Sequence, residues 1–79
     1  MEISKWLTIA EQNREVDFFY KGKKYSISIN QYGQWFLTQY GACEDAQQFD
    51  SFLELIEKAV INNVLFKEIC EEVEVDMIY

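Results

Sequence analysis

Residues 15–29 alternate between apolar and polar side chains on both sides of Lys21-Gly22, and this pattern predicts an antiparallel β-hairpin. A turn at this dipeptide places Tyr20 opposite Lys23. One face of the hairpin then carries Val16, Phe18, Tyr25, Ile27 and Ile29. The other face carries Glu15, Asp17, Phe19, Lys24, Ser26 and Ser28. A slip of one residue would mix the two sets, so the pattern specifies one register.

A three-residue turn at residues 31–33, with Gly33 in the bulge position, predicts a third strand over residues 34–40. In this register Trp35 and Leu37 extend the apolar face of the hairpin. Both faces of the third strand are partly apolar, so its alternation is weaker than that of the hairpin. A polar connection over residues 41–48 is expected to follow it.

Helices are expected before and after these strands. The first covers residues 3–12, where apolar side chains recur at helical spacing. Ser51 and Glu54 match a capping box and begin a second helix. Its apolar stripe comprises Phe52, Leu55, Ile56, Ala59 and Val60. A short helix over residues 65–72 and a strand over residues 73–77 follow, with Asn62-Asn63 interrupting the helical pattern.

The expected fold class is α+β, as a single domain over residues 1–79. An antiparallel sheet of three to four strands packs with two to three helices, in the order α-β-β-β-α-α-β. A core for so short a chain must be rich in large side chains, and 16% of the residues are aromatic.

Three aromatic residues, Phe19, Phe36 and Tyr40, fall on the second face of the predicted sheet. Two arrangements remain open for them. If helices cover only the apolar face, these residues form a contact surface for a partner. If the N-terminal helix covers the second face, they belong to the core. Tyr32 at a turn tip and Tyr79 are separate candidates for contacts.

The net charge of −7 is unevenly distributed. Residues 1–43 contain four acidic and five basic residues, a net charge of +1, whereas residues 44–79 contain ten acidic and two basic residues, a net charge of −8. Such acidity disfavours direct nucleic-acid binding, which requires Lys and Arg to replace counterions. It suits a basic protein surface, or solubility alone. The acidic residues expected to meet such a surface are Glu54, Glu57, Glu68, Glu71, Glu72, Glu74 and Asp76.

Three lysines, Lys21, Lys23 and Lys24, cluster at the hairpin tip near Tyr20 and Tyr25. Basic and aromatic residues together can bind single-stranded nucleic acid. In a chain with fourteen acidic residues, three lysines give only weak support for nucleic-acid binding. A solubilising hairpin tip is the preferred interpretation.

The residue types that usually carry chemistry are scarce. The chain contains no histidine, which removes the commonest general base and transition-metal ligand. A run of carboxylates over residues 68–76 lies on a predicted helix end and strand, without the glycine-containing loop of a calcium site. We therefore expect no enzyme activity, cofactor or metal. Cys43 and Cys70 form no CxxC motif and are expected to be reduced, with a single disulfide as the alternative.

The location of the protein is expected to be cytoplasmic, with no membrane partner. No apolar run approaches the roughly 18 residues of a membrane span. The first residues also lack the basic region and unbroken apolar stretch of a signal peptide.

Four short motifs carry a resemblance to known proteins. They are the stretch Val16 to Ile27, the aromatic strand ending at Tyr40-Gly41, the helix start Phe49-Asp50-Ser51, and Phe66-Lys67-Glu68-Ile69 before an acidic strand. Over about residues 14–79 they resemble small acidic, uncharacterised proteins of Gram-positive bacteria and their phages. These motifs are structural, so the resemblance implies no catalytic residues. In size, acidity and element order the chain is also similar to acidic anti-CRISPR proteins of phages, which occupy the DNA-binding surface of a Cas nuclease.

The leading hypothesis is a non-enzymatic protein-interaction module. Its acidic residues would dock on the basic surface of a partner, with a nucleic-acid-binding enzyme as the natural case and inhibition by DNA mimicry as the mechanism. The alternative is a homo-oligomeric structural or regulatory protein, for example a homodimer formed through Phe19, Phe36 and Tyr40 or through the edge of the last strand. A third hypothesis is that the protein is an antitoxin or immunity protein.

Overall fold

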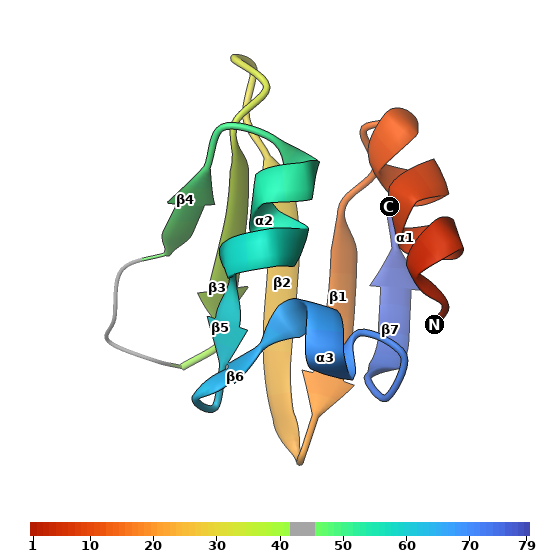
Figure 1. Cartoon of the computed structure of the whole chain (residues 1–79), viewed down its shortest axis with the longest axis vertical. Helices are drawn as coiled ribbons and strands as arrows, with labels where there is room; N and C mark the ends of the chain where they lie inside the picture. Colours follow the sequence, from red (N-terminus) through yellow and green to blue (C-terminus); the bar gives the residue numbers. More distant parts are fainter. Residues whose placement is uncertain (42–45) are drawn as a thin grey trace.

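A five-stranded antiparallel sheet, in the strand order β4-β3-β2-β1-β7, forms one layer of the computed structural model (Figure 1). The structure describes residues 1–41 and 46–79. Its helices are α1 (Ile3–Glu11), α2 (Phe52–Lys58) and α3 (Phe66–Ile69). The sheet contains β1 (Val16–Tyr20), β2 (Lys23–Ile29), β3 (Trp35–Gln39), β4 (Gln47–Phe49) and β7 (Glu74–Ile78), while β5 (Val60–Ile61) and β6 (Val64–Leu65) form a separate small hairpin.

The predicted hairpin register is confirmed. Tyr20 lies opposite Lys23, and the pairing continues to Val16 opposite Ile27. Both turn residues have positive φ, 49° at Lys21 and 79° at Gly22, as a two-residue hairpin turn requires. The register of the third strand is also confirmed, because β3 pairs with β2 so that its apolar residues extend the same face.

The predicted order and strand count were wrong in two places. A polar connection was expected over residues 41–48, of which residues 42–45 lie outside the described part of the chain. Within the described part, Gln47–Phe49 form β4, with Phe49 opposite Trp35. The Gln47 amide also bonds to the backbone of Val60, with 2.9 Å to its nitrogen and 2.7 Å to its oxygen. These contacts are made between segments distant in sequence, so local propensity gives no sign of them.

The second correction concerns the region after α2. Helix α2 begins as predicted, with the Ser51 hydroxyl accepting the Glu54 amide at 3.1 Å, but it ends at Lys58. Asn62 and Asn63 both adopt positive φ, 54° and 66°, and turn the chain back into the β5–β6 hairpin. The following helix α3 is therefore confined to Phe66–Ile69 instead of the expected residues 65–72.

All three helices lie on one side of the sheet (Figure 1), which we call the covered face. Trp6 of α1 and Phe66 of α3 are completely buried, and their rings lie 5.8 Å and 5.7 Å from that of Phe18 in β1. The Trp6 indole donates to the Cys70 carbonyl at 3.0 Å, which satisfies its buried N–H. The covered face thus carries the core and fixes α1 over β1.

Strand β7 forms an edge of the sheet beside β1 (Figure 1). Asp17 pairs with Met77 and Phe18 with Val75, so Asp76 is an extra residue in a β-bulge. The bulge places both β7 carboxylates near the side of the sheet that faces away from the helices. Across residues 1–41 and 46–79, no helix is long and apolar enough to cross a membrane.

Candidate interaction surface

The side of the sheet opposite the covered face carries no helix in the described part of the chain, and we call it the open face (Figure 1). By strand register its side chains are Asp17, Phe19, Lys24, Ser26, Ser28, Phe36, Thr38, Tyr40, Gln48, Glu74 and Met77. The arrangement in which α1 covers the second face is wrong, because α1 packs on the covered face through Trp6.

The three predicted aromatic residues therefore lie on the open face. Phe19 and Phe36 are half-buried, and Tyr40 is 52% exposed. Phe19 and Tyr40 fall in one row across the strands, separated by Lys24. Phe36 lies further along β3, opposite Ser28. The structure thus brings two of the three close together around a lysine.

Asp17 is the one buried charged residue among the described positions, and it lies on the open face in β1, the strand beside the β7 edge. One carboxylate oxygen accepts the Tyr79 hydroxyl at 2.8 Å and the Tyr40 hydroxyl at 3.2 Å. The Lys24 ammonium lies 3.8 Å from the same oxygen. These partners cover the carboxylate with polar groups, so it stays shielded without a helix above it.

The ionisation of Asp17 follows from these contacts. Burial alone would raise its pKa, but hydrogen bonds from Tyr79, Ser26 and Tyr40, together with the charge of Lys24, outweigh that effect. The pKa of Asp17 consequently lies below its ordinary value of 3.8. Asp17 is therefore a fixed negative charge on the open face at neutral pH.

Lys24 occupies the space between the two aromatic rings. Its ammonium lies 4.8 Å from the Tyr40 ring centroid and 5.8 Å from that of Phe19, within range of cation–π attraction. It also pairs with Asp76 of the bulge at 3.4 Å. The ammonium is thus surrounded by two rings and two carboxylates.

The seven acidic residues predicted to meet a partner do not form one patch. Glu54 pairs with Lys58 at 3.7 Å and Glu57 with Lys67 at 3.2 Å, so these acids stabilise the helical layer. Asp76 is paired with Lys24 on the sheet. The remaining four are exposed and make no salt bridge within the described residues; we call them the acidic margin, and they are Glu68, Glu71, Glu72 and Glu74.

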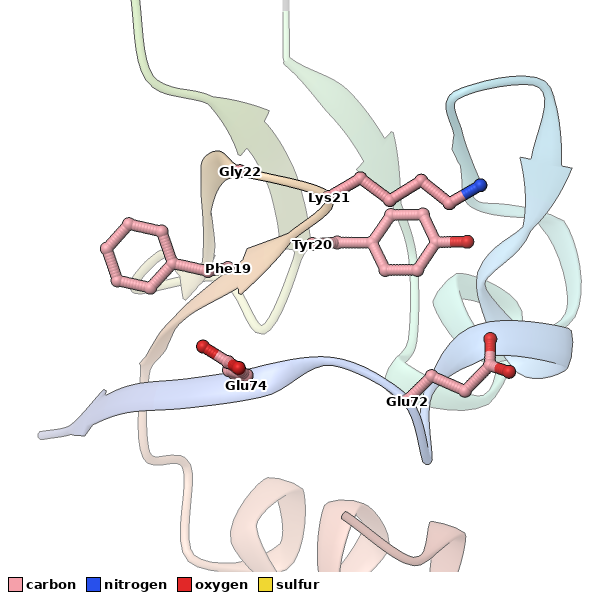
Figure 2. Close-up of a pocket in the computed structure, with 6 residues that line it drawn as sticks. All are labelled: Phe19, Tyr20, Lys21, Gly22, Glu72 and Glu74. Carbon is pink, nitrogen blue, oxygen red and sulfur yellow. The ribbon is translucent and has the colours of Figure 1, made fainter.

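A pocket of about 320 Å³, which we call the end pocket, lies where β7 separates from β1 (Figure 2). Figure 2 shows the Phe19 ring and the Glu74 carboxylate on one side of this junction, and Tyr20, Lys21 and Glu72 on the other. Gly22 completes the lining. The end pocket is where the structure brings predicted aromatic and predicted acidic residues together.

The groups that line the end pocket can attract a cation. Two carboxylates and the faces of aromatic rings suit a basic side chain, while Lys21 leaves the end pocket only partly negative. No group of three or more Cys, Asp or Glu side chains among residues 1–41 and 46–79 could hold a metal ion.

Burial, then the charge of Glu71, raises the pKa of the Cys70 thiol. The predicted state of Cys43 lies outside the described residues.

Sequence reasoning placed Asp17 and Lys24 on the correct face but assigned neither of them a role in a site. Lys24 was interpreted as part of a solubilising tip. A signal was available at Asp17, because aspartate is depleted in strands and here stands between the apolar residues Val16 and Phe18. A charge in such a place requires partners, and the structure supplies them from strands that are remote in sequence.

Compared with models of protein families, with curated proteins and with solved structures, this chain has no significant match.

Proposed function

We propose that this protein is a non-enzymatic interaction module that binds a basic surface of another protein. The open face and the acidic margin would form the contact. The observation that carries the proposal is the end pocket, where Phe19 and Glu74 of the open face line one pocket with Glu72, which lies across the junction (Figure 2). Aromatic residues at the centre of a patch and charges at its border are typical of protein interfaces.

The charge distribution supports a basic partner. Acids that serve the helical layer are already paired, whereas the four acids of the acidic margin have no basic neighbour within 4.0 Å in the described chain. They run from α3, which lies on the helical side, through the following turn to β7, and of the four only Glu74 is placed on the open face by its pairing with Phe19. Carboxylates in such a run attract Lys and Arg of a partner and speed the encounter.

A nucleic-acid-binding enzyme is the partner class that we favour, with inhibition by occupation of its DNA or RNA site. Such enzymes present a basic surface to phosphates, and carboxylates along an edge can take the place of phosphates. The net charge of −7 supports this assignment. It also predicts that partner binding weakens as salt increases.

A homo-oligomer formed through the open face is the second candidate. It is favoured by Tyr40 and Met77, which are 52% and 51% exposed on this face. Pairing through the β7 edge is disfavoured because that strand carries Glu74 and Asp76, and charged side chains discourage edge-to-edge association. Sedimentation at low micromolar concentration distinguishes the candidates: a monomer supports a module for another protein, and a tight dimer supports the homo-oligomer.

The proposed function is tested by charge reversal with a matched control. The variant E72K/E74K changes the end pocket, and the control E2K/E11K makes the same charge change at exposed positions on or beside α1. Each tagged protein is used to recover partners from nuclease-treated cell extract, and recovered proteins are quantified by mass spectrometry. We expect a basic protein whose recovery falls at least about tenfold with E72K/E74K and stays unchanged with the control.

Two results would contradict the proposal. Equal losses with both variants would mean that net charge alone governs the interaction. A partner that the wild-type protein recovers from untreated extract but not from the nuclease-treated extract would mean that nucleic acid, and not a protein surface, links the two.

A further inference from the structure

The Lys24 ammonium lies in a site that has the composition of a cation-binding cage. We call the four groups around it the cation cage: Asp17, Phe19, Tyr40 and Asp76. The carboxylates lie 3.8 Å and 3.4 Å from the ammonium nitrogen, and the ring centroids lie 5.8 Å and 4.8 Å from it. Aromatic faces combined with carboxylates are the groups that proteins use to bind organic cations.

The Asp17 side of the cation cage is held in place by its neighbours, whereas the Lys24 side chain is flexible. Tyr79 and Tyr40 hold the Asp17 carboxylate in place, and Asp17 and Phe19 stand in β1, flanked by β2 and β7. Lys24 reaches the cage through a flexible stem, its side chain is 32% exposed, and both of its ion pairs are longer than 3.3 Å. The Lys24–Asp76 pair is exposed on both sides and so holds the lysine weakly, and the 3.8 Å distance to the buried Asp17 oxygen is too long for a close contact. Another cation can therefore replace Lys24.

We propose that the cation cage is a recognition site for an arginine side chain of a partner protein, with Lys24 as its intramolecular competitor. The inference rests on the proposed function for the source of the arginine. The open face gives that side chain access, because Tyr40 is 52% exposed and Tyr79 is 61% exposed. Release of Lys24 would at the same time leave its ammonium free to move toward solvent.

Arginine fits the cage better than a second lysine. A guanidinium is planar, stacks on aromatic faces and is more weakly hydrated than an ammonium. It therefore loses less hydration when it enters a site that is only half-enclosed. A planar cation can also contact a carboxylate with two N–H groups at once, which the single ammonium of Lys24 does not do here.

The test removes the competitor and supplies the ligand chemistry as a small molecule. The variant K24A vacates the cage, and the matched control K23A removes the same charge from the adjacent exposed residue. Each isotope-labelled protein is titrated with arginine amide and, separately, with citrulline amide, which has the same α-amino group but an uncharged side chain, and backbone amide shifts are followed by NMR.

We expect saturable shifts at Phe19, Tyr40 and Asp76 in K24A with arginine amide and none with citrulline amide. Apparent affinity in K24A should exceed that of wild type and of K23A by about fivefold, the effect of removing a weak competing ion pair. The double variant D17N/K24A should lose the binding, since the buried carboxylate is then neutral.

The proposal is overturned if K24A, with a wild-type amide spectrum elsewhere, shows no saturable shift, or if citrulline amide acts as well as arginine amide. Should K24A be unfolded, the wild-type titration decides alone: displacement predicts that the side-chain signals of Lys24 move toward free-lysine values, and their constancy would refute it. None of these results depends on the E72K/E74K experiment, so the two proposals can fail separately.

Discussion

Phe18 and Phe19 are neighbours in β1, yet they belong to opposite faces of the sheet. Phe18 is fully buried on the covered face, where it stacks on Tyr25 at 5.5 Å and contacts Trp6 and Phe66. Phe19 is half-buried on the open face, beside Lys24 and the end pocket. One strand thus supplies an aromatic residue to the core and another to the candidate site, so the aromatic content of the chain cannot be assigned wholly to stability.

The largest expected effect is a difference in stability between the alanine variants of these two phenylalanines. Phe18→Ala should lower the free energy of unfolding by about 3–5 kcal/mol, because it opens a cavity among three aromatic rings. Phe19→Ala should cost less, about 1 kcal/mol, since part of the Phe19 surface already meets water. Urea titration of both variants measures the difference. Similar losses would mean that the open face is also core.

A second prediction concerns Asp17, the buried charge on the open face. Asp17→Asn should destabilise the protein by about 1–2 kcal/mol near neutral pH, because the hydrogen bonds from Tyr79 and Tyr40 then reach a neutral acceptor. The matched variant Asp76→Asn, at a more exposed carboxylate, should cost less than about 0.5 kcal/mol. Thermal unfolding compares the two, and equal costs would refute the central role of Asp17.

The pH dependence of that cost follows from the lowered pKa of Asp17. A carboxyl with a depressed pKa in the folded state contributes stability above its ordinary value of 3.8, and this contribution is lost as pH falls through the folded value. The difference between wild type and Asp17→Asn should therefore be constant above about pH 5 and shrink below about pH 4. A difference that grows on acidification would contradict the assignment.

The smallest expected effect appears at alkaline pH. The hydrogen bond to Asp17, followed by burial and the nearby negative charge, raises the pKa of Tyr79 above 10.0. A raised folded pKa gives stability that is complete below pH 10 and lost as pH rises through the folded value. Tyr79→Phe should flatten this part of the stability profile. Tyr25, whose pKa is raised by burial on the covered face, titrates in both proteins and serves as the internal reference.

The covered face could be predicted from sequence because its signals are local. Alternation around Lys21-Gly22 set the hairpin register, and Ser51 with Glu54 marked the start of α2. Strand β4 could not be found this way, since it is short, polar and exists by pairing with β3. The β5–β6 hairpin was hidden in an apolar run whose turn is two asparagines at positive φ.

The open face was harder to predict because its important contacts join distant segments. The sequence grouped Phe19, Phe36 and Tyr40 correctly on one face, but it could not tell whether a helix covered them. The Asp17 cluster combines residues separated by 23 and 62 positions in the chain, and no spacing rule reveals such a set. For the acidic residues, nearness in sequence was misleading. They were predicted to form one patch, yet the structure divides them between ion pairs in the helical layer and the acidic margin.

The central claim is that the partner binds the open face and not the helical side. Site-specific photo-crosslinking tests it directly, with benzoyl-phenylalanine placed at Phe36 on the open face or at Leu53, which is 65% exposed on α2. We predict a protein adduct from position 36, none from position 53, and loss of the first adduct when E72K/E74K is added. An adduct that forms from position 53 as efficiently as from position 36 would contradict the account.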